Sequence, residues 1–153
     1  MMTEQQIKKN RELVERYPFL TPRYAWSGKI IEDYDYSFTM LDDMPDGWRT
    51  AFGEQMCEEI RDVLVKLGKL NDYRVLQIKE KFGQLRWYND SYCKELEDVI
   101  DKYTALSERT CIVCGKPAEF VSTGWISPWC GECADKFCRC GTIPIDAFYK
   151  EDL

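Results

Sequence analysis

The chain has 153 residues, of which 44% are hydrophobic and 14% aromatic, enough to bury one core but too few for two large domains. Its 27 acidic and 21 basic side chains give a formal net charge of -6, which disfavours general binding to nucleic acid unless a local basic patch exists. The first part of the chain is polar, and no apolar run approaches the roughly 20 residues of a membrane helix. We therefore expect a cytoplasmic protein with no membrane segment.

The chain contains eight cysteines and no histidine. Because no export signal is visible, we expect a reducing compartment, in which cysteines serve as metal ligands or buried thiols rather than as disulfides. The absence of histidine removes the commonest general base and a common metal ligand. A metal site in this chain must therefore consist of thiolates alone or include carboxylates.

The N-terminal third begins with a predicted helix over residues 4–16, because Thr3 and Gln6 have the spacing of a capping box and Pro18 follows the helix. Residues 17–45 are aromatic and acidic without a sustained period. Short strands are weakly indicated over residues 29–31 and 37–41. We expect this segment to form an irregular cover over the core.

Two amphipathic helices are predicted in the middle of the chain. The first begins at Asp46 and ends before Gly68, and its apolar side chains recur mainly at four-residue steps. These residues are Trp48, Phe52, Met56, Ile60, Leu64 and Leu67. The second is capped by Ser91 and runs to residue 106. Its apolar residues are Leu96, Val99, Ile100, Tyr103 and Leu106.

Between these helices, residues 73–88 predict a β-hairpin that turns at Phe82-Gly83-Gln84. Alternation assigns one face of this hairpin to the core, namely Leu76, Ile78, Leu85 and Trp87. The opposite face carries Gln77, Lys79, Lys81, Arg86 and Tyr88. Lys79, Lys81, Arg86 and Tyr88, here called the cationic hairpin face, suit an anion-binding site, although such charges also keep an exposed strand from aggregating.

Two C-x2-C pairs, Cys111/Cys114 and Cys130/Cys133, stand fifteen residues apart. This spacing is typical of a zinc ribbon, in which two turns each offer two thiolates to a tetrahedral Zn²⁺. Residues 118–122 and 125–129 form the expected connecting hairpin. Four protein ligands leave no open position for water, so we expect a structural zinc ion; reducible disulfides or a redox pair are the alternatives.

The remaining cysteines have less definite roles. Cys138 and Cys140 are possible alternate metal ligands, part of a second metal site, or free thiols. Cys57 and Cys93 fall at helical spacing from apolar residues and are expected to be buried as small hydrophobic side chains.

Together these patterns predict an α+β fold with two amphipathic helices packed on a β-hairpin and a C-terminal zinc ribbon. The predicted boundaries are an α+β domain over residues 1–106, a zinc ribbon over 107–140 and an acidic tail over 141–153.

The motif K-E-K-F-G-x-L-R-W-Y at residues 79–88 is followed by Ala105-Leu106-Ser107, C-x-x-C-G and G-W-I-x-P-W-C. This combination resembles a family of small uncharacterised proteins of bacteriophages, prophages and their bacterial hosts, over residues from about Asp43 to Cys133. The resemblance implies a phage-type accessory protein in a bacterial host cell, in a class that often inhibits or redirects host machinery. It implies no catalytic residues.

The sequence contains neither a phosphate-binding glycine loop nor a nucleophile motif with a partner base, so we expect a protein that is not an enzyme; metal-dependent hydrolysis by its acidic loops is the weaker alternative. The favoured hypothesis is binding to a host protein, with inhibition of a defence or nucleic-acid-processing factor, through an acidic aromatic surface. This surface comprises Tyr24, Trp26, Tyr34, Asp35, Tyr36, Phe38, Asp42 and Asp43. Packing of these aromatics over the main helix, and nucleic-acid or nucleotide binding by the cationic hairpin face, are the alternatives.

Overall fold

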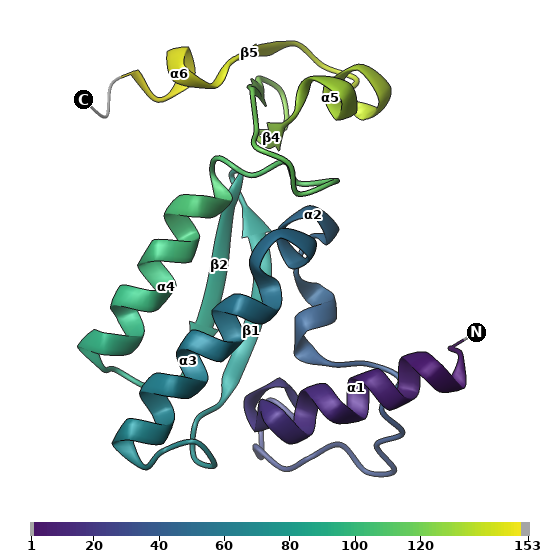
Figure 1. The fold of residues 1–153 in the computed structure, drawn as a ribbon, viewed down its shortest axis with the longest axis vertical. Helices are drawn as coiled ribbons and strands as arrows, with labels where there is room; N and C mark the ends of the chain where they lie inside the picture. Colours follow the sequence, from purple (N-terminus) through teal and green to yellow (C-terminus); the bar gives the residue numbers. More distant parts are fainter. Residues whose placement is uncertain (1, 151–153) are drawn as a thin grey trace.

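The computed structural model describes residues 2–150 and has an α+β fold with two small antiparallel sheets (Figure 1). The elements are, in chain order, α1 Glu4–Arg16, η1 Pro18–Leu20, η2 Met40–Asp43, α2 Asp46–Trp48, η3 Arg49–Gly53, α3 Glu54–Leu67, β1 Val75–Lys81, β2 Gln84–Asn89, α4 Lys94–Ser107, β3 Phe120–Ser122, β4 Pro128–Trp129, α5 Gly131–Phe137, β5 Thr142–Pro144 and α6 Ile145–Phe148. No helix within residues 2–150 has both the length and the apolar character required to cross a membrane.

Helix α1 begins with the predicted capping box, since Thr3 accepts from the Gln6 N–H and the Gln6 side chain accepts from the Thr3 N–H. In the segment that follows, the strand predicted over residues 37–41 is wrong. The chain instead turns into the short helix η2, because the Asp42 carboxylate accepts the Thr39 N–H at 2.8 Å and thereby closes a turn. The strand at 29–31 is reduced to a single bridge between Arg23 and Ile30.

The main helix runs without a break through α2, η3 and α3, over residues 46–67 as predicted. On an ideal helix, two side chains four residues apart point in directions that differ by about 40°. The wider π-helical turn η3 offsets part of this rotation. The five apolar side chains at these steps are therefore buried together, whereas Leu67 is exposed. The five are Trp48, Phe52, Met56, Ile60 and Leu64. Gly68 ends the helix with a left-handed φ of 67°, as predicted.

Strands β1 and β2 form the predicted hairpin, and Phe82 and Gly83 both have positive φ, as in a two-residue turn of type I′. The predicted burial of Leu76 is wrong, because its side chain is 48% exposed. A bulge between Val75 and Gln77 shifts the register and turns Val75 inward in its place. Ile78, Leu85 and Trp87 are buried as predicted.

The predicted cap of the second helix is also shifted. Cys93, not Ser91, is the N-cap of α4. The N–H of Ser91 is held in a turn by the Asn89 side chain at 2.9 Å, which places Ser91 outside the helix.

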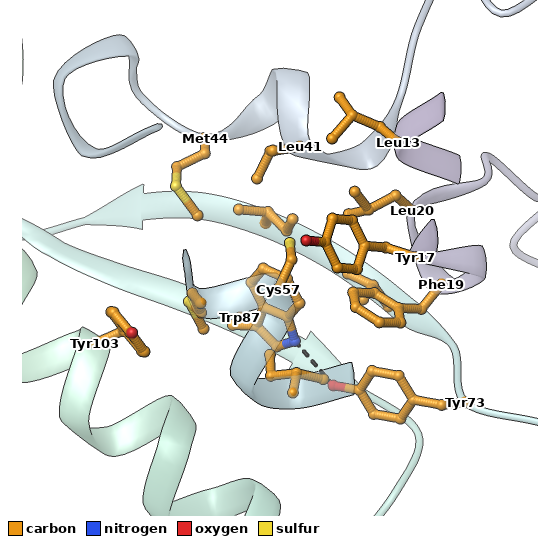
Figure 2. Packing of buried hydrophobic residues seen from close by; sticks show 14 of the residues in the cluster. Leu13, Tyr17, Phe19, Leu20, Leu41, Met44, Cys57, Tyr73, Trp87 and Tyr103 are labelled. Carbon is orange, nitrogen blue, oxygen red and sulfur yellow. Dashed lines mark hydrogen bonds between the residues drawn. The ribbon is translucent and has the colours of Figure 1, made fainter. Parts of the chain in front are cut away.

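One hydrophobic core joins α1, the main helix, the hairpin and α4. Figure 2 shows its inner part, in which Cys57 points among apolar side chains and Trp87 donates its indole N–H to the Tyr73 hydroxyl at 2.9 Å. The predicted burial of Cys57 is confirmed, and Cys93 packs half-buried against the same core. In Figure 1, α3 crosses in front of the hairpin and α4 lies beside β2, and the two helices contact each other.

Residues 108–150, here called the C-terminal module, lie at the turn end of the hairpin (Figure 1). Strands β3 and β4 pair as the expected short hairpin, and β5 adds a third strand to give the order β4-β3-β5. The acidic tail is predicted over residues 141–153, of which residues 151–153 lie outside the described part of the chain. Within residues 141–150, the Ile145 side chain is buried and its N–H donates to the Glu119 carbonyl. These residues are therefore part of the module.

The C-terminal module packs directly on the start of the main helix. The Gly47 N–H donates to the Ile112 carbonyl, and the Trp48 indole N–H donates to the Thr110 carbonyl, both at 2.9 Å. The approach is so close that a Cβ on Gly47 would lie 2.1 Å from the Cys111 carbonyl oxygen. On the hairpin side, the Gln84 side-chain amide donates to the Glu108 carboxylate at 2.5 Å. These contacts fix the module against both the helix and the hairpin.

Candidate functional site

The structure brings together the four cysteines of the two C-x2-C pairs. The sulfur atoms of Cys111, Cys114, Cys130 and Cys133 all lie within 4.8 Å of one another. Three of the side chains are buried and Cys114 is half-buried. Cys114 Sγ and Cys130 Sγ are 3.6 Å apart, well beyond the roughly 2.05 Å of a disulfide. The four thiols form a separate cluster that can hold one metal ion.

Each cysteine pair is positioned by a tight loop. In the first, the Cys111 N–H donates to the Lys116 carbonyl and the Gly115 N–H donates to the Cys111 carbonyl. Gly115 has a φ of 86°, a conformation that favours glycine. In the second, Cys130 is the N-cap of α5 and its sulfur accepts the Cys133 N–H at 3.4 Å. The Ile112 N–H donates to the Pro128 carbonyl and joins the two loops.

The electrostatics of the cluster favour a bound cation. Burial raises the pKa of the Cys111 thiol, but backbone N–H groups of Cys130, Cys114 and Val113 outweigh this and lower that pKa to about 7. Burial and the neighbouring sulfurs raise the pKa of Cys133. Four thiolates this close repel one another unless a cation lies between them. Tetrahedral metal–sulfur bonds of about 2.3 Å require sulfur separations of about 3.8 Å, so small shifts of the side chains complete the site.

Cys138 and Cys140 are not members of this cluster. Their sulfur atoms lie 3.6 Å from each other, and Cys140 is exposed. The Gly124 N–H lowers the pKa of the Cys140 thiol, with smaller contributions from Cys138 and from the Trp125 N–H. The structure thus places them as a neighbouring thiol pair beside the loop that contains Gly124.

The residues of the cationic hairpin face lie together as predicted. Lys79 is directly opposite Arg86 in the register, and the Lys79 ammonium lies 5.9 Å from the centre of the Tyr88 ring. Within residues 2–150, Lys79, Lys81 and Arg86 form no ion pair. The Arg86 Nε atom is buried and has no hydrogen-bond acceptor in the described part of the chain. Like charges directly opposite each other destabilise a hairpin, so the pairing of Lys79 with Arg86 is unfavourable for folding.

The acidic aromatic surface is divided by the structure. Tyr34 and Tyr36 pack partly against the core, and their ring centres lie 4.8 Å apart. Asp42 pairs with Arg49 and closes the η2 turn. Tyr24 is half-buried and stacks on Trp26. Four members remain exposed: Trp26, Asp35, Phe38 and Asp43.

A cleft between the hairpin turn and the C-terminal module was not predicted. It has a volume of about 350 Å³ and is lined by Lys79, Lys81, Phe82, Trp125 and Ile126, together with Glu80 and Gly124. The Phe82 side chain is 68% exposed and that of Trp125 is 78% exposed. The sequence signals for this hairpin–module cleft were Phe82 in a predicted turn, where polar residues are the rule, and Trp125 directly after the gap between the two strands predicted over 118–122 and 125–129.

Comparison of the chain with protein-family models, with curated proteins and with solved structures finds no significant match.

Proposed function

We propose that Cys111, Cys114, Cys130 and Cys133 bind one Zn²⁺ and that the C-terminal module is a zinc ribbon. The support is the donor set: four thiols within 4.8 Å, in two C-x2-C loops joined by paired strands. Zinc prefers four thiolates in tetrahedral geometry when its role is structural. With all four positions filled by cysteine, the ion has no free position for a substrate, so it stabilises the fold.

On this scaffold we propose that the protein is not an enzyme and acts by binding and inhibiting a host protein, such as a defence or nucleic-acid-processing factor. The observation that carries the binding function is the cationic hairpin face, where Lys79 and Arg86 stand opposite each other and neither pairs with an acid of residues 2–150. Arg86 provides a planar fork for a carboxylate, and the two lysines act as point charges. The phage-type context and the bacterial host come from the sequence resemblance.

The overall charge favours a protein partner over nucleic acid. The formal net charge is -6, and four thiolates around Zn²⁺ add about two further negative charges. A polyanion is repelled by such a molecule as a whole, whereas an acidic patch on a protein can meet the local cations. The exposed members of the acidic aromatic surface, Trp26 and Phe38 among them, provide a smaller second contact region.

The test is affinity capture from a nuclease-treated host lysate, followed by titration calorimetry with the purified partner. A charge reversal at a used contact should weaken binding by about 2 kcal/mol, roughly thirtyfold. We therefore expect this loss for Arg86→Glu and for Lys79→Glu. The matched control is Lys66→Glu, which makes the same charge change on an exposed lysine of α3. Unchanged affinity for both hairpin variants would refute the use of this face.

Nucleic-acid or nucleotide binding is the second candidate, and one observation favours it. Tyr88 is 41% exposed and its ring centre lies 5.9 Å from the Lys79 ammonium, as in a surface that stacks a base and holds phosphate. Phosphate contacts would make the affinity for an oligonucleotide fall steeply with salt concentration. A salt titration with single-stranded oligonucleotides therefore separates this candidate from protein binding.

A further inference from the structure

We propose that the hairpin–module cleft is the specific recognition site for the partner, and that it binds an acidic peptide segment carrying one large apolar side chain. The inference rests on the proposed protein-binding function and deepens it. The cationic hairpin face provides the attraction, and the cleft provides a place for an anchoring side chain. Three features of the cleft support this assignment: its exposed aromatic walls, its fixed floor and its cationic rim.

The two aromatic walls of the cleft, Phe82 and Trp125, reduce the folding stability of the protein when no partner is bound. Phe82 occupies the first central position of a type I′ turn with a φ of 55°, where asparagine, aspartate or glycine is preferred. A bulky residue in this region is strained, and its ring is 68% exposed, so core packing does not compensate for the strain. Trp125 likewise leaves 78% of its side chain in solvent. Exposed aromatics at neighbouring turns are typical anchors of protein interfaces.

The floor of the cleft holds the two walls at a fixed separation. A Cβ on Gly83 would lie 3.1 Å from Ile126 Cγ2, so the hairpin turn is packed closely against the module. The positive φ of Gly83 and this close approach both favour glycine at the position. Because the backbone that carries the walls is positioned before a ligand arrives, little backbone conformational entropy is lost when an apolar side chain enters between them.

The rim of the cleft carries two cations. The Lys79 ammonium lies near the Tyr88 ring, and the Lys81 ammonium lies 5.8 Å from the centre of the Phe82 ring. Glu80 is the one acid among the lining residues, and its carboxylate accepts the Gly83 N–H at 2.7 Å. The rim is therefore positive on a molecule whose formal net charge is -6. This local reversal of charge selects carboxylates next to the apolar anchor.

The dimensions and lining favour a peptide over a nucleic-acid strand. A cleft of about 350 Å³ admits one large side chain with its flanking backbone. A single strand requires cations along a track of several nucleotides, whereas the cations here are confined to the hairpin. The cleft thus matches a short acidic motif with an aromatic or large aliphatic residue at its centre.

The test is selection of displayed random short peptides on the full-length, metal-loaded protein, followed by fluorescence anisotropy with the enriched sequences. We expect enrichment of sequences with acidic residues around one large apolar residue. Trp125→Ala and Phe82→Ala should each weaken binding of such a peptide by at least about tenfold. Tyr92→Ala is the matched control, because Tyr92 is 95% exposed and does not line the cleft, and it should leave the affinity unchanged.

Four results would overturn the inference: no enrichment, enrichment of peptides that are basic or lack a large apolar residue, equal losses for Trp125→Ala and Tyr92→Ala, or tighter binding of oligothymidylate than of the acidic peptides. The two levels of the proposal fail separately. If Arg86→Glu weakens capture of the host partner but Trp125→Ala and Phe82→Ala do not, only the cleft is refuted. If neither the hairpin charges nor the cleft aromatics affect that capture, the proposed function is refuted as well.

Discussion

The two parts of this molecule are held together by different forces. The helices and the hairpin enclose a continuous core in which Trp48, Met56, Ile60 and Leu64 are fully or almost fully buried. The module's own cluster consists of Cys111, Cys130 and Cys133, with Cys114 and Trp129 packed beside them. Burial of apolar area stabilises the first part, whereas the module has too small a core to fold without a metal or its neighbour. Metal removal should therefore affect the two parts unequally.

The largest effect is expected for Cys114→Ser. A structural zinc site contributes about 10–16 kcal/mol of apparent binding free energy in small zinc-finger peptides, so loss of one ligand should unfold much of the module. Amide hydrogen exchange should rise strongly in β3, β4 and α5, while α3 and β1 remain protected. Chelation of the metal from the wild-type protein should give the same pattern. Exchange that rises equally in α3 would contradict the unequal dependence on metal.

The reverse experiment weakens the hydrophobic core and leaves the metal site intact. Ile60 has no exposed surface, so Ile60→Ala should cost about 2–5 kcal/mol and lower the melting temperature. Metal content should stay unchanged, because Ile60 belongs to the core cluster that contains none of the four clustered cysteines. Val65→Ala, on the same helix at a side chain that is 51% exposed, should change stability by no more than about 0.5 kcal/mol. Loss of metal in Ile60→Ala would show that the parts fold as one unit.

A smaller effect is expected at the junction. A Cβ on Gly47 would meet the backbone at Cys111 and Ile112, so Gly47→Ala should cost about 1–3 kcal/mol by overpacking and should also weaken metal binding. Gly53→Ala is the matched control on the same helix, since its Cβ would contact the Arg49 side chain at 3.3 Å, which can move. Thermal melts and competition with a metal chelator measure both effects. Equal behaviour of the two variants would contradict tight docking of the module on the main helix.

The sequence predicted the elements whose signal is local. Each of these signals involves side chains that are near one another in the chain. They are the four-residue spacing from Trp48 to Leu64, the Gly68 stop, the Thr3 capping box and the two C-x2-C motifs. The structure contains the helix, the helix end, the cap and the cysteine cluster that they predict. The turn at Phe82-Gly83 was found for the same reason.

What the sequence could not predict depends on contacts between distant segments. The exposure of Leu76 follows from a bulge, and no residue type in β1 predicts that bulge. Strand β5 forms because residues 142–144 pair with β3, although α5 separates the two strands in the chain. The hairpin–module cleft required Phe82 and Trp125 to lie near each other, which only the docking of the module determines. The division of the acidic aromatic surface likewise follows from tertiary packing of Tyr34 and Tyr36.

Elemental analysis of the purified protein tests the central claim most directly. We predict one tightly held zinc ion per chain, because the four clustered thiols complete one tetrahedral site and Cys138 and Cys140 lie outside it. The double variant Cys138→Ser/Cys140→Ser should keep that single ion, and Cys114→Ser should lose it. A wild-type stoichiometry near zero would contradict the metal-closed module, and a value near two would assign Cys138 and Cys140 to a second site.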